Sequence, residues 1–514
     1  MGIPVLFVYP DFVAQERTGR PGTYDVETGG WYAEGLGAMS ASLRAAGHHP
    51  SLMHLTVPPD RDEFTALLRQ HNPALVAFTV RSSAFPYCLE YTRWVKEGSG
   101  AYVIWGGYHP TLAPEECLEV PGVDSICVGE GDRAIVDLAD ALSGSKQPVH
   151  IESLWFNTAS GPVRNPVRPM VENLDELPIP DFELFDRRRL IATRTGVATA
   201  MLSRGCPFRC GYCSNHRQRA VYPNSSRYAR CRSPRNSIEY LRRLREWFPE
   251  VRELRFLDNV FGLGRMWLEE FSELYRREIG LPFSCNQRPD LVTRESLALL
   301  ARTGCRMIYM GIESGDEEVR RLILGRRISD ERLKEVFRAC REMGIATVAY
   351  NMVGLPGEDR KKALATVKMN AVCRPASVVV SVFSPYPGTD LYDLSVKKGY
   401  APRHMDYRAR TFLDQPNFSR QEVALVYTYF RLLVGLYRLA GAIPWLRRIL
   451  VLLLDTLTIS VFFRLTWLVT FGERGASAVR RFREGIRRYI PWLYRLLRAV
   501  KMAVARGGIS AIRK

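Results

Sequence analysis

Short apolar runs alternate with longer amphipathic stretches along the first 145 residues of the chain. The apolar runs predict buried strands at Val5–Tyr9, Ser51–Leu55, Ala74–Thr79, Ala101–Trp105 and Asp124–Val128. Apolar residues at helical spacing predict helices between and after them, at 31–46, 60–71, 84–97, 113–119 and 131–142. Alternating strands and helices favour a parallel sheet covered on both faces, so residues 1–145 are predicted to form an α/β, doubly wound, Rossmann-like domain.

A second βα series is predicted after a proline-containing linker at 146–190. Its strands are expected near 197–203, 252–257, 282–286, 305–312, 345–353 and 377–384. The intervening helices are expected near 237–248, 264–279, 293–303, 330–343 and 359–372. Six successive βα units over 191–400 favour a partial (β/α)6 barrel with its chemistry at the strand C-termini. The alternation stops after this, and 401–514 is predicted to be a helical region.

Net charge is concentrated at one end of the chain. The 514 residues carry a formal charge of +18, and 46% are apolar, as in folded globular proteins. Residues 431–514 contain 17 Lys and Arg against three acidic residues, which gives this segment +14 and leaves +4 for the first 430 residues. This distribution argues against a nucleic-acid enzyme with a basic active face.

The cysteines predict a reducing compartment. Eleven cysteines in 514 residues are too few and too scattered for a disulfide framework. The N-terminal run Met1–Tyr9 lacks the basic residues of a signal peptide and reads as a buried strand. The cytoplasm is therefore the expected location.

Three of the cysteines form a metal-binding pattern after the first predicted barrel strand. Cys206, Cys210 and Cys213 are separated by three and two residues, in a loop that contains glycine. Three thiolates can hold a four-iron, four-sulfur cluster and leave one iron open for a substrate. The alternative is a zinc site closed by His216 as the fourth ligand.

This loop resembles the signature of the radical S-adenosylmethionine enzymes, in which an aromatic residue, here Tyr212, precedes the last cysteine. The resemblance covers roughly residues 190–400. Four further motifs at predicted strand ends carry it, namely Phe256–Asn259, Gly311–Gly315, Gly354–Glu358 and Pro385–Thr389.

The resemblance implies that S-adenosylmethionine chelates the open iron and is cleaved reductively to methionine and a 5′-deoxyadenosyl radical. It places Tyr212 beside the cofactor and Asp258 or Asn259 at its methionyl amine. Glu313 and Ser314 would bond the ribose hydroxyls or the carboxylate, and Arg288 would pair with the carboxylate. The ordinary alternatives are a capping turn at Asp258–Asn259, a salt bridge of Glu313 and a solvated Arg288.

The N-terminal domain resembles that of the cobalamin-binding subgroup of this superfamily, which includes class B methyltransferases and anaerobic tetrapyrrole cyclases. The resemblance then covers residues 1 to about 400. Two glycine-containing loops and the Leu-Pro-x-Pro-Asp linker carry it. The resemblance implies that the corrin lies over the strand C-termini. The residues implied to bind it in these loops are Gly106, Gly107, His109, Gly129 and Glu130.

The sequence lacks the Asp-x-His-x-x-Gly string that supplies a histidine to cobalt in cobalamin mutases. Cobalt is therefore expected to have no histidine ligand. Thr79 and Arg81, in the loop after the third strand, are the candidates for its lower face. His109 is expected to act as a hydrogen-bonding or structural residue more readily than as a cobalt ligand.

Two apolar segments follow the barrel. Ile449–Phe463 is interrupted by Asp455 and is shorter than the roughly 20 residues that span a bilayer. Val479–Val500 alternates arginine pairs with apolar residues, as a helix in the plane of an anionic membrane does. The alternatives are a helical cap on the barrel and an RNA-binding segment.

The leading hypothesis is a cobalamin-dependent radical S-adenosylmethionine enzyme that methylates an unactivated carbon of a small, hydrophobic substrate. Oxidative cyclisation or rearrangement with the same cofactors is an alternative. A non-catalytic, membrane-associated metal-binding protein is another. The leading hypothesis implies an electron donor such as flavodoxin or ferredoxin, no nucleic-acid partner, and a cytoplasmic location that includes the inner face of the membrane.

Overall fold

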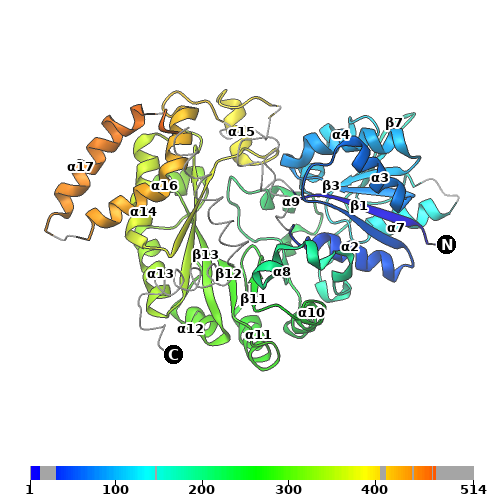
Figure 1. The fold of residues 1–514 in the computed structure, drawn as a ribbon, viewed down its shortest axis with the longest axis horizontal. Helices are drawn as coiled ribbons and strands as arrows, with labels where there is room; N and C mark the ends of the chain where they lie inside the picture. The colour runs from blue at the N-terminus through cyan, green and yellow to red at the C-terminus, as the bar shows by residue number, and fades with distance from the viewer. Residues whose placement is uncertain are drawn as a thin grey trace. The chain divides into compact units, whose positions relative to one another are not determined.

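The computed structural model describes residues 2–11, 30–144, 148–403, 405, 413–442, 445–465 and 467–469. The chain divides into two compact units. The first comprises Met1–Arg209, Cys213–Leu281 and Tyr386–Thr389, and the second comprises Cys210–Tyr212, Pro282–Pro385 and Asp390–Lys514. Figure 1 identifies their helices and strands by label.

The first unit is built on a sheet of order β2-β1-β3-β4-β5-β6-β7. Its first five strands pair in parallel, as predicted. They are β1 (Pro4–Pro10), β2 (His49–Leu55), β3 (Leu75–Thr79), β4 (Tyr102–Gly106) and β5 (Ser125–Cys127). The neighbours β2 and β3 lie on opposite sides of β1, so the chain reverses its direction of winding there, which is where doubly wound sheets bind ligands.

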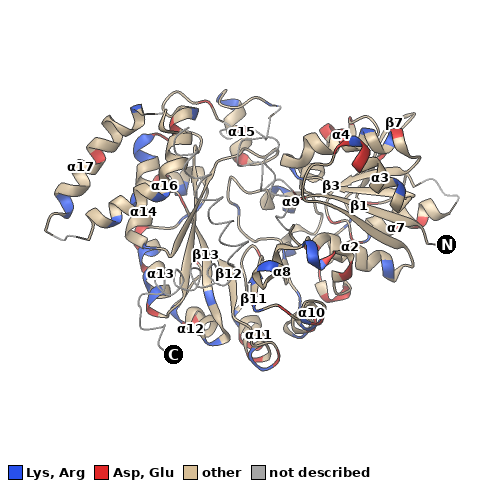
Figure 2. Ribbon diagram, in the orientation of Figure 1, with Lys and Arg blue, Asp and Glu red and all other residues tan. Residues whose placement is uncertain are grey.

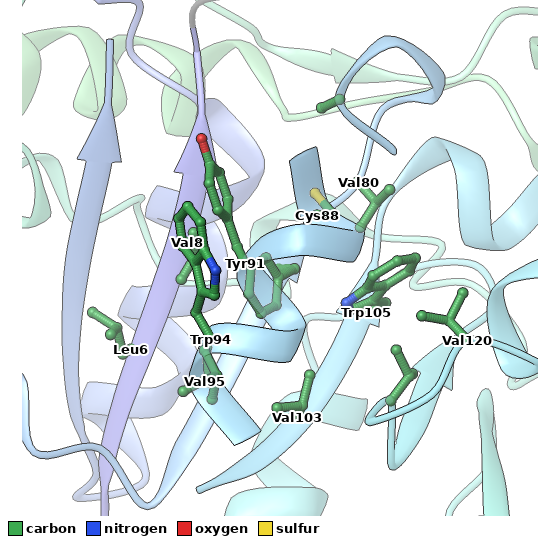
Figure 3. Packing of buried hydrophobic residues seen from close by; sticks show 14 of the residues in the cluster. Leu6, Val8, Val80, Cys88, Tyr91, Trp94, Val95, Val103, Trp105 and Val120 are labelled. Carbon is green, nitrogen blue, oxygen red and sulfur yellow. The ribbon is translucent and has the colours of Figure 1, made fainter. Parts of the chain in front are cut away.

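Helices cover this sheet. They are α2 (Glu34–Ala45), α3 (Arg61–His71), α4 (Phe85–Gly98), α5 (Tyr108–Leu112), α6 (Pro114–Leu118) and α7 (Ala134–Ser143). Figure 3 shows Tyr91, Trp94 and Val95 of α4 packed with Val103 and Trp105 of β4 and with β1. The indole of Trp105 is fully buried and donates to the Thr92 hydroxyl at 2.9 Å. The N–H of this buried indole is therefore satisfied inside the core.

The sheet has two more strands than the five that the sequence predicted. An antiparallel hairpin, β6 (Leu154–Thr158) and β7 (Gly161–Arg164), extends the edge at β5, within the segment predicted as a linker. Pro162 does not prevent this pairing, because β7 is the edge strand of the sheet, where proline is tolerated.

The rest of the first unit carries the start of the second βα series. After α8 (Ile191–Thr195), β8 (Val197–Ala200) pairs in parallel with β11 (Glu253–Phe256). A small antiparallel hairpin, β9 (Ser203–Arg204) and β10 (Arg230–Cys231), flanks the predicted cysteine loop. The remaining helices are α9 (Asn215–Ala220), α10 (Pro234–Trp247) and α11 (Arg265–Glu278).

The second unit continues the series with four parallel strands. They are β12 (Phe283–Gln287), β13 (Cys305–Glu313), β14 (Ala346–Val353) and β15 (Ser377–Val382), paired in chain order. The helices between them are α12 (Arg294–Thr303), α13 (Asp330–Glu342) and α14 (Arg360–Cys373), with a short π-helix, η6 (Val319–Ile323), before α13. All six strands of the second series are thus close to their predicted positions.

Helices end the described part of the chain. After α15 (Asp390–Lys397), α16 (Arg420–Ala440) packs against α14 and β15. Helix α17 (Arg447–Ser460) and a 3-10 turn, η7 (Phe462–Arg464), follow. By length and composition α16 is the one helix among the described residues that suffices to cross a membrane, yet 44% of its most apolar window is buried in the protein. The predicted basic helix at 479–500 lies outside the described residues.

Candidate functional site

The cysteine loop leaves β9 through a glycine that no other residue can replace without strain. Gly205 has a φ of +79°, and a Cβ at this position would lie 2.1 Å from the carbonyl oxygen of Tyr228. Cys206 and Cys213 are partly exposed and Cys210 is buried. Two of the three sulfurs are thus accessible in part, as ligands of a cofactor bound at a loop need to be.

Two side chains donate hydrogen bonds to these sulfurs. Within the second unit, Nη1 of Arg288 lies 3.2 Å from Sγ of Cys210. Within the first unit, Nδ2 of Asn215 lies 3.3 Å from Sγ of Cys213. Donors at this distance stabilise thiolate over thiol, and hydrogen bonds to ligand sulfur also tune the potential of an iron–sulfur cluster.

The described residues contain no group of three or more His, Cys, Asp or Glu side chains that could hold a single metal ion. A closed zinc site of three cysteines and His216 would need such convergence. A four-iron cluster places each thiolate on a different iron, so its ligands do not meet at one point. This geometry favours the cluster over zinc.

Asp258 and Asn259 follow β11 but lie in different surroundings. Asp258 is buried, and its Oδ1 accepts hydrogen bonds from the backbone N–H of Leu202 at 3.0 Å and from the Ser203 hydroxyl. Burial raises the pKa of Asp258 to about 6. Asn259 is exposed and donates to the carbonyl of Gly205 at 3.1 Å. Asp258 therefore fastens the start of the cysteine loop, and Asn259 is the better placed of the two to meet a ligand.

Glu313 ends β13 in a strained conformation. Its φ is +63°, a region that non-glycine residues rarely adopt, and such outliers concentrate at functional sites. Its Oε1 accepts hydrogen bonds from the Tyr212 hydroxyl at 3.1 Å and from Nη1 of Arg326 at 2.9 Å. Burial raises the pKa of Glu313 above its ordinary value. Gly311 makes room for this carboxylate, because a Cβ there would lie 1.9 Å from Oε1.

Ser314 is fully buried beside Glu313. Its hydroxyl accepts a hydrogen bond from the backbone N–H of Asp316 at 3.2 Å, and its carbonyl accepts one from the buried Arg320 at 2.8 Å. These bonds shape the turn after β13. The hydroxyl oxygen of Ser314 supports that turn, whereas the neighbouring Glu313 accepts hydrogen bonds from Tyr212 and Arg326.

The two arginines of the second unit differ in how fully they are paired. Arg288 donates from Nε and Nη2 to both carboxylate oxygens of Asp290, at 3.1 and 2.8 Å. Arg326 is only 3% exposed, and its Nε and Nη2 have no hydrogen-bond partner among the described residues. Although burial disfavours the charge, Tyr212 and Glu313 raise the pKa of Arg326. A charged guanidinium with two open donors in a buried position is a ready carboxylate site.

At the carboxyl edge of the first sheet, Arg81 bridges the ends of β3 and β1. Its Nη2 donates to the carbonyl of Pro10 at 2.7 Å and lies 3.8 Å from a carboxylate oxygen of Asp11. Asp11 also accepts a hydrogen bond from His54 at 3.0 Å. Thr79 ends β3 and is partly exposed. Both residues predicted for the lower face of cobalamin therefore lie where the winding of the sheet reverses.

The two glycine loops of this edge are held together by Thr111. Its hydroxyl donates to the carbonyl of Gly107 at 2.9 Å and accepts from the backbone N–H of Gly129 at 3.1 Å. Gly107 and Gly129 have φ values of +104° and +96°. Gly106, the last residue of β4, accepts a hydrogen bond from the N–H of Val80 at 2.7 Å. The loops thus expose backbone without a side chain at the strand ends.

His109 is buried beneath these loops. Its Nδ1 lies 3.0 Å from the Ser82 hydroxyl, and its Nε2 lies 3.5 Å from a carboxylate oxygen of Glu116. The ring also packs against Phe85. Its surroundings are those of a structural histidine inside the domain.

Glu130 and Asp132, in the loop after β5, form an ion-pair cluster with the hairpin β9–β10. Asp132 receives two hydrogen bonds from Arg204, at 2.7 and 2.9 Å, and Glu130 receives two from Arg230, at 2.6 and 3.2 Å. Burial opposes ionisation of Asp132, but the charge and hydrogen bonds of Arg204 hold its pKa below the ordinary value. Because Arg204 is two residues before Cys206, this cluster ties the last loop of the first sheet to the cysteine loop.

Sequence patterns did not predict the ion pairs or hydrogen bonds of three of these residues. Arg204, Asp132 and Arg326 are charged residues in a chain that is 25% charged, and only burial and partners distinguish them. The adjacent Arg327 looks the same in sequence but is exposed. Position two residues before the first cysteine was the one available hint for Arg204.

Comparisons with known proteins agree with this architecture. The family model of the radical SAM superfamily matches residues 201–369, and that of the B12 binding domain matches residues 28–139. An uncharacterised methyltransferase of Pyrococcus horikoshii is 27% identical over 356 residues, which cover 68% of this chain and 75% of the relative. The hopanoid C-3 methylase of Methylococcus capsulatus is 27% identical over 399 residues, covering 76% and 72%.

A solved structure has the same fold. The radical S-adenosylmethionine methyltransferase TsrM of Kitasatospora setae, with cobalamin and a [4Fe–4S] cluster bound, superposes with a TM-score of 0.61 at 20% identity, over 77% of this chain and 75% of that one. The predicted α/β domain followed by a partial barrel is thereby confirmed. The cofactors of such enzymes are a [4Fe–4S] cluster, S-adenosylmethionine and cobalamin. The chain carries a B12-binding domain followed by a radical SAM domain, the two parts of a cobalamin-dependent radical SAM enzyme.

Proposed function

We propose that this enzyme transfers a methyl group to an unactivated carbon of a small, hydrophobic substrate. The observation that carries the proposal is the presence of both domains in one chain whose relatives include a methyltransferase and a methylase. The hopanoid methylase acts on an apolar molecule by its name, which supports the hydrophobic class of substrate. The cluster and S-adenosylmethionine supply the reductive cleavage that starts the reaction, and cobalamin supplies the methyl group.

The chain's own contribution at the cluster is to hold and shield it. Cys206, Cys210 and Cys213 are proposed to bind three of its irons, since they lie in one loop within the segment that matches the radical SAM model. Arg288 and Asn215 would keep the donors that they already direct at Cys210 and Cys213. Because these N–H groups favour a more negative sulfur, they stabilise the reduced cluster.

Arg326 is proposed to receive the methionyl carboxylate of S-adenosylmethionine. Its Nε and Nη2 can donate to the two oxygens of a carboxylate. The same two nitrogens of Arg288 already donate to Asp290. Glu313 and Tyr212, which contact Arg326 and each other, would orient the ribose hydroxyls. Asn259 is the exposed amide proposed to accept from the amine.

The carboxyl edge of the first sheet is proposed to hold cobalamin. Gly106, Gly107 and Gly129 lie in the loops at the strand ends, where Val80 packs beside Gly107 and Tyr222 packs beside Gly129. Thr79 and Arg81 would face the ligand from the end of β3. Because both ring nitrogens of His109 have neighbours inside the domain, we expect the bound cobalamin to be base-off and to lack histidine coordination. A paramagnetic resonance spectrum of the Co(II) form should then show no axial nitrogen splitting, and such splitting would remove this assignment.

The test is product analysis with S-adenosylmethionine that carries a deuterated methyl group. Anaerobically prepared enzyme with cluster and cobalamin should produce both 5′-deoxyadenosine and S-adenosylhomocysteine and should place the label on cobalamin. Deoxyadenosine without S-adenosylhomocysteine would support cyclisation or rearrangement in place of methylation. Absence of both products, with iron and cobalamin bound, would overturn the proposal.

Each reductive cleavage consumes one electron, which we propose a flavodoxin or ferredoxin supplies. The low number and scattered positions of the eleven cysteines suit a reducing compartment, and we propose the cytoplasm. The donor is tested by running the same product analysis once with a chemical reductant and once with reduced flavodoxin in its place.

A further inference from the structure

Exposed apolar side chains gather at the end of the described chain. Of nineteen large apolar side chains exposed among the described residues, ten lie between positions 432 and 467. Four of them, Ile449, Leu452, Leu453 and Leu457, are 54 to 67% exposed and share one side of α17 by helical spacing. These four residues are called the α17 face below. Single exposed leucines are common, but a row of this kind marks an interaction surface.

An ordinary surface helix turns its apolar side toward the protein, whereas α17 turns its polar side toward the protein. Its only acidic residue, Asp455, points toward the protein, with Oδ2 3.0 Å from Nζ of Lys368 on α14 and Oδ1 2.8 Å from the Tyr437 hydroxyl on α16. Thr458, its one buried residue, lies on that same side. Polar contacts therefore anchor the inner side, and the α17 face is turned outward.

Figure 1 shows α17 on the outer side of α14 and α16 in the second unit, away from the strands. In Figure 2 the helix is mostly uncharged along its length. Exposed arginines flank the face, with Arg447 and Arg448 at the first turn of α17 and Arg464 just after it. A second exposed row, Leu432, Leu436 and Leu439, runs along α16.

We propose that the α17 face docks on an anionic membrane surface, with α17 lying in the plane of the membrane. An apolar row between basic residues is the arrangement by which helices bind such surfaces, and the +14 charge of residues 431–514 adds long-range attraction. A spanning orientation is ruled out for α17, because its 14 residues are about 21 Å long and the bilayer core is about 30 Å thick. Membrane docking stands independently of the methylation proposal.

The experiment measures binding of the full-length protein to vesicles by flotation. Vesicles of phosphatidylcholine mixed with phosphatidylglycerol should bind it at low salt, and phosphatidylcholine alone should bind it weakly. The double variant Leu452→Gln/Leu453→Gln should bind the anionic vesicles at least ~10-fold less. Arg447→Gln/Arg448→Gln should lose binding chiefly at low salt. Met266→Gln, which changes an 83% exposed apolar residue on α11, is the matched control and should bind normally.

Three outcomes would overturn the inference. The first is full-length protein that ignores anionic vesicles at low salt. The second is a dimer in the absence of vesicles that the leucine double variant dissociates, which would assign the α17 face to a second copy of the chain. The third is a large loss of thermal stability in the double variant, which would show that the chain itself covers the face. Unchanged stability with lost binding supports membrane docking.

Discussion

Two buried side chains, Arg326 and Glu358, keep hydrogen-bonding capacity that the described residues leave unsatisfied. Arg326 has two N–H groups without a partner, and Glu358 has one such carboxylate oxygen, Oε1. Leaving a buried polar group unpaired costs about 1–3 kcal/mol, so such groups usually have a ligand or an altered protonation state. A ligand explains the open donors of Arg326, and protonation explains the open oxygen of Glu358.

Arg326→Ala is expected to weaken binding of S-adenosylmethionine by about 10- to 100-fold, because a charged hydrogen-bonding pair contributes about 1.5–3 kcal/mol. Equilibrium dialysis with radiolabelled S-adenosylmethionine against cluster-loaded enzyme measures the change, and iron content should stay the same. The exposed neighbour provides the control, since Arg327→Ala should bind like the parent. Equal losses in both variants would contradict a carboxylate site at Arg326.

Because the pKa of Glu358 is raised, we expect the unfolding free energy of the protein to fall as pH rises. Burial raises its pKa to about 8, although the backbone N–H groups of Gly354 and Leu355 donate to its Oε2. The folded state therefore binds a proton that the unfolded state releases above its ordinary pKa of 4.5. The stabilisation is complete below that value and falls by about 1.4 kcal/mol per pH unit until pH reaches about 8.

Glu358→Gln imitates the protonated acid and should remove this dependence. Urea unfolding of both proteins between the two pKa values should show the parent losing stability relative to the variant as pH rises. Glu34, whose pKa burial raises to about 7, is present in both proteins and cancels in the difference. A difference that stays constant with pH would show that Glu358 is ionised in the folded protein.

At the scale of secondary-structure elements, the ion-pair cluster after β5 fixes the hairpin β9–β10 that leads into the cysteine loop. Asp132→Ala leaves Arg204 without its bidentate partner in a mostly buried position. We expect a loss of roughly 3 kcal/mol in unfolding free energy, measured by urea titration. Arg164→Ala breaks an equally short but exposed pair with Glu115 and should leave the unfolding free energy nearly unchanged. Similar effects of the two changes would show that the cluster is not a structural clamp.

Strand and helix positions were predictable because they depend on local apolar periodicity. The six strands of the second series needed nothing else, and the motifs at their ends followed from them. The hairpin β6–β7 was missed because proline and charged residues mask an edge strand. The outward orientation of α17 was not predictable, since Asp455 looks like an interruption of an apolar run until Lys368 and Tyr437 are seen beside it.

The same limit applies to the candidate site. Spacing predicted Cys206, Cys210 and Cys213 as cluster ligands, and the resemblance to the radical S-adenosylmethionine enzymes suggested Glu313 and Arg288. The hydrogen-bond and ion-pair partners of each residue decide what it can do, and those partners are set by the tertiary structure. Asp258 and Ser314 had suitable chemistry by sequence, but the structure places both inside hydrogen-bonded turns.

At the scale of the whole molecule, the cofactors are assigned to different parts of the chain, which makes the cysteine substitutions a test of modularity. Cys206→Ala, Cys210→Ala and Cys213→Ala combined should remove the brown absorbance, the iron and all cleavage of S-adenosylmethionine. The variant should still bind cobalamin, because the strand ends that are proposed to hold it belong to the separate parallel sheet of the first unit. Iron analysis and the cobalamin spectrum of anaerobically purified protein measure both effects. Retained iron would refute the assignment of the three cysteines, whereas loss of cobalamin together with iron would show that the cysteine loop is needed to keep the loops of the first sheet in place.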